Sequence, residues 1–323
     1  MTLPKRYLLA LVAGLGIVAA SHQTRAEDTV TFGHVGSPSG IVWPIYIGMD
    51  EGIFAADQIK IDMVFTRSSA QVLQQLAAGS LGLGDTGAFD PIRGVKEGAA
   101  VAVLAIEATP GPFTLIAKSS IKSIKDLKGK TISVGETTDI ARVYMDRMLE
   151  ANGMADKDVD ALPTNSTAAR LAALESGAVD AAMLSAPSSF KAVADGFVSL
   201  GQAADVVKDF PFGTLVVSRQ WAGDNTALVK RFMHAYLKSV AWFYDEKNRD
   251  RAVKIMVEAS KQSDSDVAQS YDFYRKIGFF ERTGKVDPAQ LQALVKVLQQ
   301  AGEIKGELPT EKLVMAGVTE MIK

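Results

Sequence analysis

Apolar and polar residues follow one another along residues 29–190 in short blocks of two kinds. Blocks that alternate with a period of two and are rich in β-branched residues predict strands, and blocks with apolar residues three or four positions apart predict helices. Predicted strands cover residues 29–35, 59–65, 81–85, 101–105, 131–134, 159–162 and 179–184. Predicted helices cover residues 43–57, 68–78, 88–97, 139–152 and 166–176, with another beginning at Pro187. This alternation predicts an α/β fold with a parallel sheet that is covered on both faces.

The pattern changes after Gly213, and from Trp221 onward the chain is predicted to be almost entirely helical. The predicted helices of this part cover residues 226–244, 249–259, 264–277 and 288–301. The full length of 323 residues is enough for about two domains. We therefore expect two α/β units accompanied by a group of C-terminal helices.

Residues 66–87 and 164–185 have similar sequences. Each stretch contains a strand end, hydroxyl residues, a helix with inward-facing leucines and a glycine before the next strand. The identical residues are Thr66 and Thr164, Ser68 and Ser166, Ala70 and Ala168, Leu73 and Leu171, Leu76 and Leu174, and Gly79 and Gly177. Strand–helix units in general share such leucines and glycines, but the paired hydroxyls and the common order of elements predict two similar lobes.

The first stretch ends in residues 82–87, which match the pattern G-x-G-x-x-G of dinucleotide-binding loops. In such a loop the glycines follow a strand and open a helix. Here Gly82 and Gly84 fall inside a predicted strand, and Glu107 is an unconvincing candidate for the acidic residue that would bind a ribose. The context therefore argues against nucleotide binding.

The first 26 residues have the order of a secretory signal peptide. Lys5 and Arg6 precede an apolar run over residues 7–20, and small residues follow as far as Ala26. The run is too short for a transmembrane helix, so we expect cleavage after Ala26, with Ala20 as an alternative site. A retained membrane anchor is the competing interpretation.

Charge and composition exclude several classes of protein. Removing residues 1–26 takes away three basic side chains and no acidic one, which changes the formal net charge from −2 to −5. That balance does not suit a nucleic-acid binder, which needs basic side chains to replace counterions. The chain has no cysteine, which excludes disulfides, thiol catalysis, iron–sulfur ligation and a lipid-modified N-terminal cysteine. His22, His34 and His234 are far apart in sequence, so we expect no metal site and no cofactor.

Small and hydroxyl residues stand at the carboxyl ends of the predicted strands, where the following helices begin. They are Ser37, Ser39, Ser68, Ser69, Thr86, Gly87, Ala88, Thr137, Thr138, Ser166, Thr167 and Ser185. Ligands of open α/β sheets bind beyond these strand ends, and the free N–H groups at a helix start favour an anion. Each hydroxyl taken singly is also explained as a helix cap worth about 1 kcal/mol. Together they predict an anion-binding cleft shared by two lobes.

Other side chains near the predicted cleft have two interpretations each. Trp43 is either an apolar wall of the cleft or a packing residue of the first helix, and we include it among the ligand-binding candidates. Phe89 is assigned to the core. Arg67 is either an anion ligand or a solvated residue at a strand end, and the imidazole of His34 is a possible ligand contact. Glu107 and Glu136 are possible contacts if the ligand has donors.

Three segments carry a resemblance to a known family. They are "PIYIGMDEGIFAADQIKIDMVF" (residues 44–65), "DLKGKTISVG" (126–135) and "LAALESGAVDAAMLSAPSSF" (171–190). With them, residues 29–221 resemble the nitrate/sulfonate/taurine branch of the periplasmic solute-binding proteins of ABC importers. That family also includes binders of thiamin-pyrimidine precursors and aromatic acids. The pattern is specific for the fold and weakly specific for the ligand.

The resemblance implies a type II periplasmic binding protein, whose two lobes close on a ligand about a hinge. We expect crossover strands at residues 113–118 and 213–219, a first lobe of residues 27–112 and 220–323, and a second lobe of residues 113–219 with the flanking hinge strands. It also implies a monomer of the periplasm that is not lipid-anchored. Its partners would be a small ligand and an ABC permease with its ATPase.

The ligand that fits the hydroxyls and helix starts is a small organic anion, a sulfonate or a carboxylate. A neutral or heteroaromatic ligand, such as a thiamin-pyrimidine precursor, is the alternative. An enzyme on the same fold is a third class, but neither His34 nor His234 lies in a hydrolase motif. The related thiamin-pyrimidine synthase pattern contains cysteine, which this chain lacks. A sensing domain of a regulator is disfavoured by the leader and the lack of a DNA-binding segment.

Overall fold

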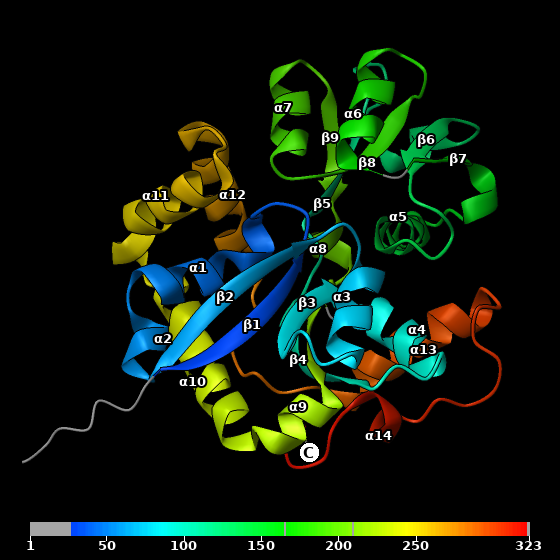
Figure 1. The fold of residues 1–323 in the computed structure, drawn as a ribbon. Coiled ribbons are helices and arrows are strands. Elements are labelled where there is room, and N and C mark those ends of the chain that lie inside the picture. The colour runs from blue at the N-terminus through cyan, green and yellow to red at the C-terminus, as the bar shows by residue number, and fades with distance from the viewer. Residues whose placement is uncertain (1–26, 165, 209, 322–323) are drawn as a thin grey trace, which may run out of the picture.

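A computed structural model describes residues 27–164, 166–208 and 210–321 (Figure 1). The predicted signal peptide, residues 1–26, lies outside the described residues. No helix in the described part of the chain is long and apolar enough to cross a membrane. The fold is built on two five-stranded sheets.

The first sheet has the strand order β2-β1-β3-β10-β4. Its strands are β1 (Asp28–Val35), β2 (Ile59–Thr66), β3 (Leu83–Gly87), β4 (Val101–Ala108) and β10 (Gly213–Ser218). The first strand pairs in parallel with β2 and β3, whereas β10 runs antiparallel to both β3 and β4. The expected parallel sheet is therefore a mixed one, because the strand that returns from the other sheet enters in the opposite direction.

The second sheet has the order β7-β6-β8-β5-β9, which repeats the plan of the first. Its strands are β5 (Phe113–Ala117), β6 (Thr131–Val134), β7 (Asp160–Pro163), β8 (Ala181–Ser185) and β9 (Val198–Gln202). Here β5 is the antiparallel strand and pairs with both β8 and β9. The sequence pattern did not predict β9, but it did predict two similar α/β units.

In sequence, helices alternate with the strands of both sheets. They are η1 (Gly40–Val42), α1 (Trp43–Asp50), α2 (Ile53–Ala56), α3 (Ser69–Ala77), α4 (Asp90–Lys96), η2 (Ile124–Leu127), α5 (Ile140–Ala151), η3 (Asp156–Asp158), α6 (Thr167–Glu175), α7 (Ser188–Ala194) and α8 (Ala203–Val206). The predicted single helix over residues 43–57 is wrong. Gly52 has φ of 68° and breaks it into α1 and α2, because this left-handed conformation suits glycine and not a helix interior.

The C-terminal part is helical as predicted. Its elements are α9 (Arg219–Asp224), α10 (Thr226–Tyr244), η4 (Glu246–Asn248), α11 (Arg249–Ser260), α12 (Asp264–Ile277), α13 (Pro288–Gln300) and α14 (Thr310–Leu313). Figure 1 shows α10, α11 and α12 beside α1 and the first sheet, and α13 and α14 next to α4. A core of aromatic and aliphatic side chains joins α1, α10, α11 and α12 to the first sheet.

The chain passes between the two sheets twice, at residues 109–112 and at the described residues between 207 and 212. The strands expected to be crossovers lie inside the sheets: β5 is in the second and β10 in the first. Tyr144 of α5 joins the two passages. Its hydroxyl accepts a hydrogen bond from the N–H of Gly111 and donates one to the carbonyl of Phe210, each at 2.6 Å.

Candidate functional site

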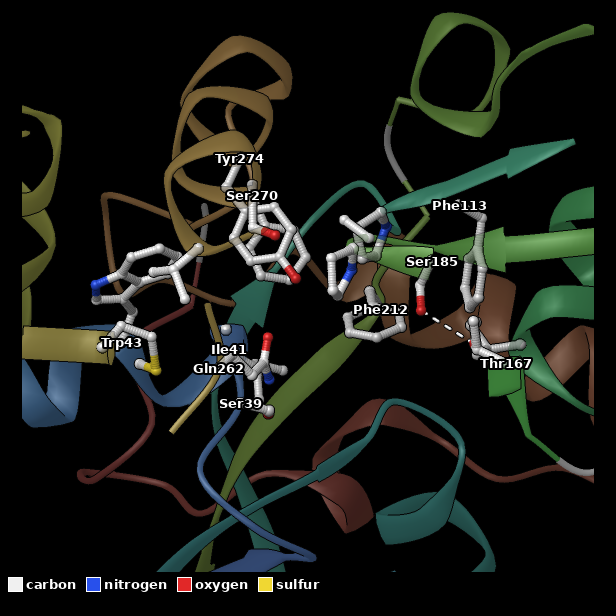
Figure 2. Close-up of a pocket in the computed structure, with 18 of the residues that line it drawn as sticks. Ser39, Ile41, Trp43, Phe113, Thr167, Ser185, Phe212, Gln262, Ser270 and Tyr274 are labelled. Carbon is white, nitrogen blue, oxygen red and sulfur yellow. Dashed lines mark hydrogen bonds between the residues drawn. The ribbon is translucent and has the colours of Figure 1, made fainter. Parts of the chain in front are cut away.

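A cavity of about 330 Å³ opens between the two sheets (Figure 2). Its wall comes from η1, from the two passages, from strand ends of the second sheet and from the region of α11 and α12. The lining residues are Ser39, Gly40, Ile41, Trp43, Pro112, Phe113, Asp139, Ile140, Ser166, Thr167, Arg170, Ser185, Ala186, Pro187, Phe212, Met256, Gln262, Val267, Ser270, Tyr274 and Phe279. The size is that of a site for a small organic molecule.

The second sheet supplies a polar end to this cavity. Arg170 of α6 is 3% exposed, and its Nε donates to the carbonyl of Thr164 at 2.9 Å. Its Nη2 lies 3.6 Å from Oδ1 of Asp139. Burial lowers the pKa of Arg170, and Asp139 opposes that shift, so the guanidinium keeps its charge at neutral pH. The cation lies in the first turn of a helix, where the free N–H groups also favour an anion.

Hydroxyl groups surround the start of the same helix. Ser166 accepts a hydrogen bond from the N–H of Ala169 at 3.2 Å and so caps α6. Thr167 and Ser185 share a hydrogen bond of 3.0 Å, drawn in Figure 2 on the side of the cavity opposite Trp43 and Tyr274. These hydroxyls can accept and donate at once. They form, with Arg170, a surface suited to the oxygens of an acidic group.

Aromatic rings form much of the remaining wall. Tyr274 stacks on Phe279 with ring centroids 4.3 Å apart, and Phe212 contacts both Phe279 and Phe113. Gly40 is required at its position, because a Cβ there would lie 2.3 Å from the ring of Tyr274. The walls therefore suit the apolar part of an organic molecule.

The hydroxyl of Tyr274 makes no hydrogen bond to the described residues, although only 7% of the residue is exposed. Burial raises the pKa of Tyr274, so the hydroxyl stays protonated and is available as a donor or acceptor. Tyr274 lines the cavity, where a polar group of a ligand can bond to this hydroxyl.

Three polar side chains form a row that ends at the opposite wall: Asp85 and His34 lie in the first sheet, and Ser39 precedes η1 and lines the cavity. The Nδ1 atom of His34 lies 2.8 and 2.9 Å from the two carboxyl oxygens of Asp85. Its Nε2 lies 3.4 Å from Oγ of Ser39, which lines the cavity. His34 and Asp85 are 3% and 4% exposed, so the cavity reaches this pair through Ser39.

The structure brings five of the predicted ligand-binding residues to the cavity: Ser39, Trp43, Ser166, Thr167 and Ser185. Trp43 contributes little surface there. It is 1% exposed, its indole N–H donates to the carbonyl of Ala252 at 2.8 Å, and its ring packs on Phe243 and Tyr271. Its main role is in the core, as one of its two interpretations stated.

The other candidates lie elsewhere. Ser69, Thr86 and Gly87 line a smaller hollow that also contains His34 and Asp85, and Thr137 lines a hollow between α5 and α13. Ser68 caps α3 by accepting from the N–H of Gln71. Ser37 is exposed, and Ala88 is buried with its N–H bonded to the carbonyl of Phe212. A ligand contact at these positions stays a prediction.

Thr138 takes part in a contact between the two halves of the molecule. Its carbonyl accepts from Nη2 of Arg93 at 3.2 Å, and its hydroxyl bonds to Glu303. Arg93 and Glu303 also pair directly, with Nε 2.8 Å from Oε2. We call these three residues the clasp. Since Arg93 belongs to α4 beside the first sheet and Thr138 follows β6 of the second, the clasp bridges the cleft rim.

The sequence pattern missed Asp139, Arg170, Phe212, Gln262, Ser270 and Tyr274 as cavity residues. For Arg170 a signal existed: it stands at the place of Val72 when residues 66–87 and 164–185 are aligned. An arginine replacing a core valine in a repeated unit indicates a different environment. For Tyr274 and Ser270 no local signal exists, because α12 reaches the cleft only through the tertiary fold.

Comparisons with known proteins agree with this architecture. The chain is similar in structure to the periplasmic aliphatic sulphonate-binding protein SsuA of Escherichia coli, with a TM-score of 0.73, 17% identity, and coverage of 90% of this chain and 98% of that one. The alkanesulfonate-binding protein SsuA of Xanthomonas axonopodis pv. citri bound to MOPS is similar with a TM-score of 0.67 and 19% identity, and the match covers 90% of this chain and 99% of that one. The nitrate-binding protein NrtA of Synechocystis PCC 6803 is similar with a TM-score of 0.66 and 15% identity, and the match covers 87% of this chain and 83% of that one.

These likenesses confirm the predicted periplasmic-binding-protein fold. A mutant of DszB in complex with biphenyl-2-sulfinic acid is also similar, with a TM-score of 0.66, 16% identity, and coverage of 89% of this chain and 96% of that one. No curated protein matches the chain. The family model described as NMT1/THI5 like matches residues 41–249. The chain therefore belongs to the NMT1/THI5-like family.

Proposed function

We propose that this protein is the solute receptor of an ABC importer, and that it captures a small organic anion, a sulfonate or a carboxylate, in the cavity between its sheets. The observation that carries the proposal is the placement of buried Arg170 at the start of α6, beside the hydroxyls of Thr167 and Ser185 and open to the cavity. The similarity to sulfonate- and nitrate-binding proteins supports it.

The walls favour an organic anion over a small inorganic one. A nitrate ion would occupy little of a cavity of about 330 Å³ and would leave its aromatic walls in contact with water. An acid with an apolar body places the charged group at Arg170 and the body beside Tyr274 and Phe212. Burial of that body contributes roughly 25 cal/mol per Å² of apolar surface.

Capture proceeds by closure of the two lobes about residues 109–112 and 207–212. Both passages are short, and both are held by the hydroxyl of Tyr144. The mature protein acts as a monomer in the periplasm after removal of residues 1–26, without a lipid anchor. The closed form delivers the solute to an ABC permease with its ATPase.

A neutral heteroaromatic solute is the second candidate, and the free hydroxyl of Tyr274 together with Asp139 favours it. Such a ligand would use these groups as hydrogen-bond partners and would gain little from the charge of Arg170. Substitution of Arg170 therefore separates the two candidates.

We propose no catalytic role for the site. The order Ser39–His34–Asp85 is that of a hydrolase triad, but Ser39 stands 3.4 Å from the imidazole, and we assign the row to ligand recognition. Hydrolysis of 4-nitrophenyl acetate by the wild type that is lost in Ser39→Ala would contradict this assignment.

The function is tested by uptake. Cells that lack this gene should lose import of one or more organic sulfonates or carboxylates, and the wild-type gene should restore it. A gene carrying Arg170→Met should be exported and folded but should not restore import. Unimpaired uptake of all tested anions in the deletion strain would contradict the proposal.

A further inference from the structure

His34 and Asp85 form a buried pair inside the first sheet. His34 belongs to β1 and Asp85 to the neighbouring β3, and both carboxyl oxygens lie within 2.9 Å of the same ring nitrogen. A buried carboxylate needs a cation or several donors close by. The imidazole is the group that meets both carboxyl oxygens, which favours an imidazolium–carboxylate pair.

The neighbouring side chains of Glu107, Tyr236 and Phe65 supply no further cation to Asp85. Glu107 of β4 is fully buried, and neither of its carboxyl oxygens makes a hydrogen bond to the described residues. Burial, followed by the charge of Asp85, raises the pKa of Glu107 well above its usual range, which favours its uncharged form. Burial also raises the pKa of Tyr236 on α10, and β2 presents the ring of Phe65.

The protonation of His34 decides what Ser39 offers to the cavity. In a neutral imidazole whose Nδ1–H faces Asp85, Nε2 is an acceptor. The hydroxyl of Ser39 then donates to Nε2 and turns only lone pairs toward a ligand. In the imidazolium, Nε2 is a donor, and the hydroxyl proton of Ser39 is free to point at an acceptor in the cavity.

We propose that His34 is a positioning residue that makes Ser39 a hydrogen-bond donor to the bound anion, so that the anion and a proton on His34 bind together. The inference rests on the proposed function as an organic-anion receptor and adds a hydrogen-bond donor, opposite Arg170. A solute without an acceptor gains nothing from it. The cleft thereby selects for anions from both of its walls.

The sign of the effect follows from linkage. Because the anion favours protonated His34, the affinity is highest at low pH and falls as pH rises through the range in which His34 loses its proton. A hydrogen bond supported by a charge changes affinity by about tenfold to a hundredfold. We expect at least a tenfold weakening between the two ends of this range.

Sulfonates are suitable probes because they stay ionised throughout this range, so that any proton taken up on binding belongs to the protein. Ethanesulfonate, hexane-1-sulfonate and benzenesulfonate are titrated calorimetrically against the wild type over the imidazole range. The titrations use two buffers of different ionisation enthalpy, which reports the protons bound per ligand. The wild type should take up protons on binding, increasingly so in the upper half of the range.

Two variants and one control locate the proton. His34→Gln should bind the sulfonate more weakly at low pH and without proton uptake. Ser39→Ala keeps the His34–Asp85 pair and should lose most of the pH dependence, which keeps the test valid if His34→Gln does not fold. His234→Gln is the matched control, because His234 pairs with Asp57 at 2.8 Å on the surface, outside the cavity. It should behave as the wild type does.

The outcomes separate the inference from the function on which it rests. Absence of binding of every sulfonate and carboxylate at all pH values contradicts the proposed function itself. Binding with a flat pH profile and no proton uptake overturns the inference alone. Proton uptake that persists in both His34→Gln and Ser39→Ala overturns it as well, since another group would then carry the proton.

Discussion

The two strand–helix–strand units of this protein differ most where their sequences look most alike. In both, a serine caps the helix: Ser68 accepts from the N–H of Gln71, and Ser166 accepts from the N–H of Ala169. Four residues after each serine the units diverge. Val72 is fully buried against the first sheet, and Arg170 lies at the wall of the cavity. The repeated residues build the same kind of strand–helix–strand unit in both lobes. Arg170, at a position where the two sequences differ, adds a charge to the second unit.

The strands show the reverse difference. Gly33 pairs with Gly84 in the first sheet and Ser133 with Ala182 in the second, so the residues that follow occupy equivalent places. In the first sheet these are His34 and Asp85. In the second they are Val134 and Met183, which are fully buried apolar residues. One lobe thus places its titratable pair within the sheet, behind Ser39, and the other places Arg170 at a helix start that lines the cavity.

The largest effect is expected at the position where the units diverge. Arg170→Met should weaken binding of the organic anion by about tenfold to a hundredfold or more, because a charge-assisted hydrogen bond contributes about 1.5–3 kcal/mol. The matched change Val72→Ala should leave affinity unchanged and lower the free energy of unfolding by about 1–3 kcal/mol. Calorimetry and denaturant unfolding measure the two effects. Equal affinities for wild type and Arg170→Met would show that Arg170 does not bind the anion and would contradict the proposed difference between the two units.

A smaller difference is expected at the caps. Ser166→Ala/Thr167→Ala and Ser68→Ala/Ser69→Ala should each lower the free energy of unfolding by about 1 kcal/mol, since each pair contains a helix cap. Only the first pair lines the main cavity, and it should weaken ligand binding by about tenfold. The same loss of affinity in both pairs would show that the first lobe contributes its helix start equally.

The charged interior of the first sheet gives a prediction about pH and stability. Burial raises the pKa of Glu107 in the folded state, so the folded state holds this proton more tightly than the unfolded chain does. The stabilising contribution is complete below the unfolded pKa and is lost as pH rises through the folded pKa. Glu107→Gln should therefore keep its melting temperature better than the wild type as pH is raised from the acidic range in which an exposed glutamate titrates. Melting temperatures that fall equally with rising pH in both proteins would contradict this prediction.

The smallest effect is expected at the clasp. Glu303→Gln removes the ion pair with Arg93 but leaves the contacts of the cavity intact. Partly exposed ion pairs contribute about 0.2–1 kcal/mol, so affinity should change by no more than about fivefold. Small-angle scattering with and without the ligand would show whether the balance of open and closed forms has moved. A change larger than that at Arg170→Met would make the clasp, and not the cavity, the main determinant of binding.

Local patterns predicted the regular elements well, because their signals are local. The α10 and α12 boundaries match the pattern, and Ser68, Asp139 and Ser166 cap helices where hydroxyl or carboxyl residues precede an apolar run. The direction of β5 and β10 was not predictable, because it depends on how the chain passes between sheets. Tyr274 was missed for the same reason: its place in the cleft is set by packing against Gly40, far away in sequence.

The two hydrogen bonds of the Tyr144 hydroxyl have a consequence for how fast the protein can respond to a solute. Because one hydroxyl holds both passages between the sheets, a rotation of one passage strains the other. In the closure proposed above, the two lobes should therefore move about one axis and not through many independent twists. That closure would then be a single relaxation, and its rate would limit how quickly a bound solute is enclosed.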